Sequence, residues 1–443
     1  MTFQNIKLYS NKKIIINFLI CFIPLSFIAG NLILNLNIAF ICLMAIIFYG
    51  KKIFNFKLIA LDKLIVLFFL YILFNGIYNT INNFNEVSKD LFILEKSFFY
   101  LRFLLLYIII RFLISEDKII FKYFFLSYGF VSLFVAVDVL IQFTFGSDIF
   151  GFEGSGRRFA GPFNQEYLAG SFIQRFSLFS LFLIILFFRT KNKFFNYLLL
   201  TFVLTITLLG LIVAGNRVPL LMFFISMFLI IIFQKDMRKI LFFLIIISIL
   251  SIPMLMKSDR DFNSHYIGFV DKTSEISSYY LKKIRGENPI AINTYIKEFE
   301  TGFETWKLNK YLGGGVKSFY QNCLKIDPET AKRWGDGNFK VNNCPNHPHN
   351  YHIQILAELG YVGYILFLIT FIIIILKSVK NLFNNKNFIE KNSILLPFVM
   401  ILIVEIFPFK TTGSFFTTGN ATFVFFIIAF IVGLVEYRIQ KKY

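Results

Sequence analysis

The distribution of apolar residues constrains the fold of this chain more than any other feature. Long runs rich in Phe, Ile and Leu recur along the 443 residues, and short charged segments separate them. A run of about 20 mostly apolar residues can cross a bilayer as an α-helix. In lipid, backbone N–H and C=O groups find no water to bond to, so they must be paired within the protein, as they are in a helix. About twelve such runs occur. They lie near residues 14–30, 32–50, 63–81, 98–115, 123–145, 167–189, 194–214, 217–234, 239–256, 350–376, 393–409 and 421–437. The sequence therefore predicts an all-α polytopic membrane protein, a bundle of about twelve transmembrane helices.

Composition agrees with this class. Hydrophobic residues make up 57% of the chain and charged residues only 16%, and the mean hydropathy is +0.67. A water-soluble domain is normally about half apolar or less. The net charge of +19 is spread between the apolar runs, whereas a nucleic-acid-binding protein gathers its basic residues on one soluble face. We therefore expect no nucleic-acid partner and interpret the charge as a topology signal.

Basic residues are distributed unequally between alternate loops. One set holds most of them: Lys51, Lys52, Lys57, Lys118, Lys122, Arg189, Lys191, Lys193, Lys235, Arg238, Lys239, Lys377, Lys380, Lys386 and Lys391. By the positive-inside rule this set is cytoplasmic, and both termini are cytoplasmic with it. Lys7, Lys12 and Lys13 precede the first run without a clear cleavage site, which indicates a retained signal anchor.

This orientation divides the chain into three parts. Residues 1–256 hold the first nine helices, residues 257–348 form one large periplasmic loop, and residues 349–443 hold the last three helices. An amphipathic helix is predicted in the loop, because apolar residues recur at three- or four-residue spacing from Tyr295 to Trp306. Cys323 and Cys344 also lie there, and an oxidising compartment permits a disulfide between them.

Three of the four histidines cluster where this loop meets the tenth helix. His347, His349 and His352 occur within six residues. Asn350, Gln354 and Glu358 then continue at four-residue spacing, so they form a polar stripe on an apolar helix. Such a stripe can simply bond to neighbouring helices. A metal site is the other alternative, but the one- and two-residue histidine spacings fit tetrahedral zinc poorly. We expect no metal and no cofactor.

Three arginines are predicted on the same face as the histidines. Arg217 follows the turn between the seventh and eighth helices, and Arg157 and Arg158 lie in a Gly- and Pro-punctuated loop that ends near Asn164. A guanidinium can bond to two phosphate oxygens and stays charged, so an arginine suits a pyrophosphate. Alternatively, these arginines only extend their charged ends to the membrane–water interface. The positive-inside rule disfavours basic residues on the periplasmic face, and a shared anionic ligand would explain why these arginines lie there. Charges inside the helices, namely Arg102, Asp138, Arg175 and Glu405, should pair or face water.

These residues resemble the O-antigen ligase and O-antigen polymerase superfamily. The resemblance lies in His349-Asn350 followed by Leu356-Ala357-Glu358-Leu359-Gly360-Tyr361-Val362-Gly363, in Leu312-Gly313-Gly314-Gly315-Val316, in the Arg217 turn and in the loop around Arg158. It implies transfer of a glycan from undecaprenyl pyrophosphate to a sugar hydroxyl at the periplasmic face of a bacterial inner membrane. For the ligase branch the acceptor is the lipid A core.

The resemblance also implies roles for residues. His349 is the candidate base, with His347 as its rival, and Arg217 is expected to stabilise the leaving pyrophosphate. Substrate binding is expected of Arg157, Arg158, Asn164, Asn350, His347, Lys317 and Glu358. Two alternatives stay open: a repeat-unit polymerase or protein O-oligosaccharyltransferase with the same donor, and a transporter or flippase, for which inverted repeats would be the sign.

Overall fold

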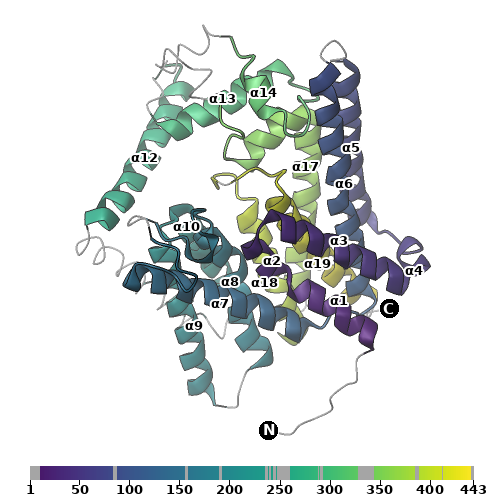
Figure 1. The fold of residues 1–443 in the computed structure, drawn as a ribbon, viewed down its shortest axis with the longest axis vertical. Coiled ribbons are helices and arrows are strands. Elements are labelled where there is room, and N and C mark those ends of the chain that lie inside the picture. The colour runs from purple at the N-terminus through teal and green to yellow at the C-terminus, as the bar shows by residue number, and fades with distance from the viewer. Residues whose placement is uncertain are drawn as a thin grey trace.

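The chain folds into a bundle of helices (Figure 1). The computed structural model describes residues 10–82, 87–154, 158–188, 192–234, 238, 241–242, 246, 260–287, 289, 293–327, 344–384, 389–411 and 413–440. Within these ranges every regular element is helical. The first half holds α1 (Asn11–Cys21), α2 (Ile23–Ala29), α3 (Asn31–Tyr49), α4 (Lys51–Phe54), α5 (Ala60–Asn82), α6 (Val87–Ser115), α7 (Phe121–Phe145), η1 (Gly161–Phe163), α8 (Ala169–Phe187), α9 (Lys193–Val213) and α10 (Arg217–Phe233). The second half holds α12 (Arg260–Ile284), α13 (Thr294–Leu308), α14 (Phe319–Cys323), α17 (Tyr351–Asn384), α18 (Ile389–Glu405) and α19 (Thr418–Gln440).

Most of the predicted membrane spans have a helix at the expected place. In the described part of the chain, 9 helices are long and apolar enough to cross a bilayer, counting α1 with α2 as one. Two more predicted spans coincide with shorter apolar helices, Arg217–Phe233 and Ile394–Glu405. The span predicted at 239–256 lies almost wholly outside the described residues. The structure confirms an all-α, multi-pass membrane protein.

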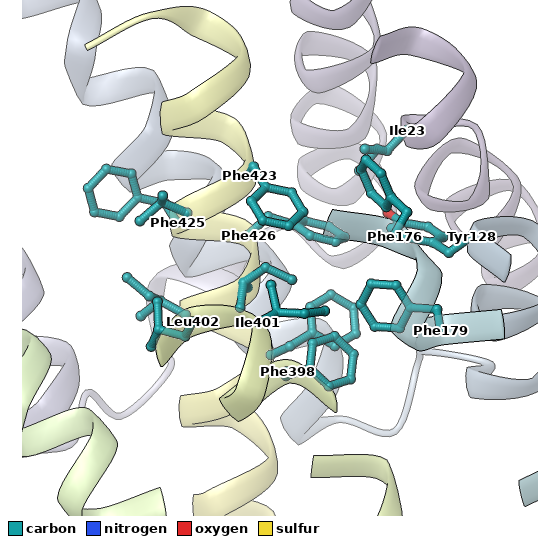
Figure 2. Packing of buried hydrophobic residues seen from close by; sticks show 14 of the residues in the cluster. Ile23, Tyr128, Phe176, Phe179, Phe398, Ile401, Leu402, Phe423, Phe425 and Phe426 are labelled. Atoms are coloured by element: carbon teal, nitrogen blue, oxygen red, sulfur yellow. The ribbon is translucent and has the colours of Figure 1, made fainter. Parts of the chain in front are cut away.

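Aromatic side chains fill the centre of the bundle (Figure 2). Phe124 on α7 lies 5.2 Å from Phe179 on α8 and 4.8 Å from Phe430 on α19, measured between ring centroids. Phe398 on α18 stacks on Phe430 at 4.8 Å. Because lipid is as apolar as these rings, close packing rather than exclusion from water must hold the helices together. A Cβ atom on Gly129 of α7 would lie 2.8 Å from the Cα of Ser180, so the missing side chain permits the close approach of α7 and α8.

The long connection before α17 is largely helical. The amphipathic helix predicted from Tyr295 to Trp306 is confirmed as α13, but α12 was not predicted. A separate small core, in which Ile296, Phe319 and Ala357 are buried, joins α13 and α14 to α17. A disulfide links Cys323 to Cys344 within this core. Figure 1 shows α13 and α14 at the end of the bundle where α17 begins, with α12 extending from α13.

We use the term loop face for the connections that precede α8, α10, α17 and α19 and that follow α7 and α18. Hydrogen bonds join several of these connections: Asn350 bonds to the connection after α18, and Gly170 bonds to Asn216 before α10. Arg102, in the middle of α6, bonds to Thr418 at the start of α19. The candidate residues from segments far apart in the sequence are thereby brought to one face.

Candidate functional site

The histidines lie in a short turn whose shape is fixed by Asn350. The side-chain oxygen of Asn350 accepts from the backbone N–H of Ile353 at 3.1 Å, as an N-cap residue does. Its side-chain nitrogen donates to the carbonyl of Pro408 at 2.7 Å, which joins the turn to the connection after α18. His349 has a φ of +50°, a left-handed conformation that a non-glycine residue rarely adopts. Such strain persists only where neighbouring contacts impose it, and it is common at functional sites.

The rings of His347 and His349 lie together beside a carboxylate of α13. Their centroids are 4.3 Å apart, and Nε2 of His349 lies 3.9 Å from Oε1 of Glu298. A Cβ atom on Gly302 of α13 would lie 2.3 Å from the side chain of Ile353. This glycine therefore lets α13 approach the start of α17 and bring Glu298 to the histidines. The sequence did not identify Glu298 as a site residue, because only the structure shows that α13 places it beside the histidines.

Burial changes the protonation of this group. Desolvation raises the pKa of Glu298 to about 7. Burial, together with the neighbouring His349, lowers the pKa of His347 to about 4. Oε2 of Glu298 and Nε2 of His347 are buried and have no hydrogen-bond partner among the described residues. Buried polar atoms normally have such a partner, so these two atoms are exceptions among the described residues.

Directly beneath the turn lies a buried ionic network. Arg175 of α8 donates to both carboxylate oxygens of Glu405, at 2.5 and 3.1 Å. Lys410 donates to the same carboxylate at 2.7 Å, and the hydroxyl of Tyr351 donates to it at 2.9 Å. Arg175 also donates to Asn420 at 2.7 Å. Two cations therefore share the carboxylate of Glu405, and the same carboxylate holds Tyr351, the residue after Asn350, in place. The expectation that charges inside the helices pair or face water is thus met at Arg175 and Glu405, which pair with each other.

Arg217 and Arg158 lie around the start of α8. Arg217 is the first residue of α10, and the side chain of Asn216 before it bonds to the carbonyl of Tyr167 and to the N–H of Gly170. The guanidinium of Arg158 lies 5.6 Å from the ring centroid of Tyr167. Both arginines therefore surround one short segment. From there α8 continues to Arg175, which bonds to Tyr351, so this helix connects the arginines to the histidine turn.

Asn164 and Arg157 are the other two residues of this loop that are expected to bind substrate. Asn164 follows η1 with a φ of +56° and is exposed. Arg157 lies outside the described residues. On α7, Gln142 donates to the carbonyl of Phe152 at 3.0 Å and accepts from the N–H of Gly161 at 2.8 Å. The loop that carries Arg158 is thus anchored to the end of a membrane helix.

The glycines of two motifs, residues 312–316 and 356–363, form one backbone junction. Gly360 interrupts α17 with a φ of +67°, which leaves backbone groups of the helix unpaired. The carbonyl of Glu358 accepts from Gly315 at 2.8 Å, and the N–H of Tyr361 donates to Lys310 at 2.9 Å. A Cβ atom on Gly360 would lie 2.3 Å from the carbonyl oxygen of Tyr311, and one on Gly313 would lie 2.4 Å from that of Glu358. Glycine is therefore required at Gly313 and Gly360 for the backbone of the 312–316 segment to pack against the kink of α17.

Glu358 and Lys317 lie at this junction rather than beside the histidines. The buried carboxylate of Glu358 accepts from the backbone N–H of Lys317 at 2.6 Å and from the side chain of Gln354 at 2.9 Å. Lys317 has a φ of +62° and its side chain is exposed. Glu358 thus orients the backbone of the loop that presents Lys317. The polar stripe predicted on α17 serves, at Gln354 and Glu358, to hold this loop and Ser414.

The fold and this group of residues define a multi-pass membrane protein whose candidate site lies where its membrane helices meet a helical cap. Residues 200–368 match the family model described as O-antigen ligase. The match spans α9, the Arg217 turn, the histidines and Glu358, and it confirms the resemblance to the O-antigen ligase and polymerase superfamily. No curated protein matches the chain. The similarity of this segment supports a function of the O-antigen ligase or polymerase type.

Proposed function

We propose that this protein is an O-antigen ligase, which transfers a glycan from undecaprenyl pyrophosphate to a sugar hydroxyl of the lipid A core. The observation that carries the proposal is the histidine turn: within the segment that matches the family, His349 lies beside Glu298, and Tyr351, which follows the turn, bonds to Arg175 of α8. A base and a set of phosphate-binding cations on one face are what glycan transfer from a pyrophosphate requires.

In the proposed reaction the acceptor hydroxyl attacks the anomeric carbon of the donor glycan. The new carbon–oxygen bond forms as the bond to the pyrophosphate oxygen breaks, and the hydroxyl proton passes to His349. Negative charge then grows on the leaving pyrophosphate, and Arg217 with Arg158 and Arg157 stabilises it more strongly than in the ground state. Asn350 holds the turn in place, and Asn164 is available to bond to donor sugars.

The surroundings of the two histidines favour His349 as the base. The pKa of His347 is lowered to about 4, so its imidazole is a weak proton acceptor at neutral pH. Its role in the proposal is to bond to the acceptor in the neutral state. Glu298 lies 3.9 Å from Nε2 of His349, where it can orient the imidazole and favour the imidazolium that forms.

The proposed location is the bacterial inner membrane, with both termini in the cytoplasm and the loop face in the periplasm. The unequal loop charges support this orientation. The disulfide between Cys323 and Cys344 supports an oxidising compartment for the cap. No metal or cofactor enters the proposed mechanism, because imidazole and guanidinium groups supply its proton transfer and charge stabilisation.

A repeat-unit polymerase is the second candidate, since the family match includes both branches of the superfamily. A polymerase, or a protein O-oligosaccharyltransferase, takes the same donor and differs in its acceptor. A transporter or flippase binds its substrate near the middle of the membrane, whereas the candidate residues of this chain gather at one face. We therefore favour a transferase.

The test is transfer by the purified protein in lipid nanodiscs, with an undecaprenyl-pyrophosphate-linked glycan as donor and lipid A core as acceptor. His349→Ala and Arg217→Ala should each lower the rate by at least about 100-fold, as expected for loss of a general base or of transition-state charge stabilisation. Lys307→Gln is the control, because Lys307 forms an exposed pair with Glu304 on α13. Wild-type transfer by His349→Ala would remove His349 from the mechanism.

A further inference from the structure

A second group of cations is formed by residues of α6 and of the loop between α13 and α14. Gly315 packs on α6, because a Cβ atom on it would lie 2.3 Å from the side chain of Ile93. Lys317 follows two residues later, and Lys96 lies one helical turn beyond Ile93. Arg102, about 9 Å further along α6, donates to the hydroxyl of Thr418 at 3.2 Å.

The backbone holds Lys317 in position for this group. Its N–H donates to Glu358 at 2.6 Å and its φ is +62°, so the loop conformation is fixed by a buried carboxylate. The side chain itself is exposed. Glu358 thereby places an ammonium group beside α6 while its own charge stays buried.

The positive charges of this group are only partly neutralised. Among the described side chains, the carboxylates beside it are Glu358, which is engaged with backbone groups, and Glu95, which lies 3.3 Å from Lys96 on the exposed side of α6. Desolvation lowers the pKa of Lys317, and the charges of Lys96 and Arg102 lower it further against the opposing effect of Glu358. Nε of Arg102 is buried and has no hydrogen-bond partner among the described residues. The three cations therefore favour an anion.

The surroundings are those of a membrane surface rather than of open water. Phe98 and Phe99 of α6 are 60% and 53% exposed, and Tyr320 after Lys317 is 44% exposed. Aromatic side chains of this kind are enriched at the headgroup level of a bilayer, and clustered cations beside them recognise lipid phosphates.

We propose that Lys96, Arg102 and Lys317 bind the phosphate group of a lipid, at a site separate from the one proposed for the donor pyrophosphate. The phosphate can belong to an acceptor lipid or to a phospholipid of the surrounding membrane. The proposal concerns binding, so it does not depend on the transferase reaction.

The experiment measures binding of defined lipids by native mass spectrometry of the purified full-length protein. The probes are dioleoyl phosphatidylglycerol, dioleoyl phosphatidylcholine, bisphosphorylated lipid A and the same lipid A after phosphatase treatment. The variants are Lys96→Gln, Lys317→Gln and both combined with Arg102→Gln. Lys307→Gln is the control, because its exposed pair with Glu304 lies on α13.

Wild-type protein should bind at least one anionic probe more tightly than phosphatidylcholine. Each single variant should weaken that binding about fivefold, and the triple variant about 100-fold, at about 1 kcal/mol per cation. A preference for bisphosphorylated over dephosphorylated lipid A, beyond that for phosphatidylglycerol, assigns the site to the acceptor; equal binding of both anionic probes assigns it to membrane lipids. Unchanged binding by Lys96→Gln and Lys317→Gln, whose side chains reach the surface and tolerate substitution, overturns the proposal even if the triple variant does not fold.

Discussion

Glu405→Gln tests how the buried network supports the site. The wild-type carboxylate is 1% exposed and bonds to Arg175 at 2.5 Å and to Lys410 at 2.7 Å. Glutamine keeps the shape and one acceptor oxygen, but it leaves two buried cations without a counter-charge. Removing one member of a buried ion pair costs about 3–5 kcal/mol, because the remaining charge is buried unpaired. We expect the free energy of unfolding to fall by that amount.

The assay is reversible unfolding by sodium dodecyl sulfate in mixed micelles, followed by circular dichroism. Glu304→Gln is the matched control, because its partner Lys307 on α13 is 51% exposed, and pairs that solvent reaches contribute about 0–1 kcal/mol. Lys410→Met should partly rescue Glu405→Gln, since it removes one of the two uncompensated cations, with a coupling of about 0.5–3 kcal/mol in a double-mutant cycle. A loss by Glu405→Gln no larger than that by Glu304→Gln would refute the reasoning.

Three further predictions concern the junction, the arginine and pH. Gly360→Ala should destabilise the fold by about 1–3 kcal/mol, because its Cβ would meet backbone at 2.3 Å, whereas Gly419→Ala, with only a ring atom at 3.4 Å, should be near neutral in the same unfolding assay. Arg217→Lys should transfer at least about tenfold more slowly than wild type if two phosphate oxygens are bound; an unchanged rate would argue for a simple charge. Between pH 4.5 and 6.5 the lowered pKa of His347 makes stability rise with pH, and the raised pKa of Glu298 makes it fall. Glu298→Gln should therefore expose a rise of at most about 1.4 kcal/mol per pH unit, reduced by solvent screening at half-buried His347. A flat curve for this variant would contradict the lowered pKa of His347, and an equal rise in the wild type would contradict the raised pKa of Glu298.

The membrane bundle could be predicted from the sequence because lipid imposes one strong pattern. Runs of apolar residues place helices such as α7 and α19 to within a few residues. The helix α12 was not predicted, because its apolar residues are interspersed with polar ones in a segment that reads as a loop. The spacing of aromatic residues predicts only α13, although α12 is at least as amphipathic.

The candidate site was predictable in its residue types and only partly in its geometry. The histidines, Asn350 and Arg217 were recognisable as a cluster and as parts of motifs. The approach of Glu298 to His349 depends on Gly302 and on the docking of α13, which are tertiary features. The purpose of the glycine motifs also required the structure, since Gly313 and Gly360 lie 47 positions apart in sequence numbering and meet only at the kink of α17.

The central claim, that this protein attaches a finished glycan to the lipid A core, is tested most directly by deleting the gene and analysing the surface polysaccharide. The account predicts lipid A core without attached glycan, and polymer that remains on its polyprenyl carrier. Re-expression of the wild-type chain should restore attachment, and re-expression of the His349→Ala variant should not. Lipid A core that carries a single repeat unit would instead indicate a polymerase, and unchanged surface glycans would contradict a role in either reaction.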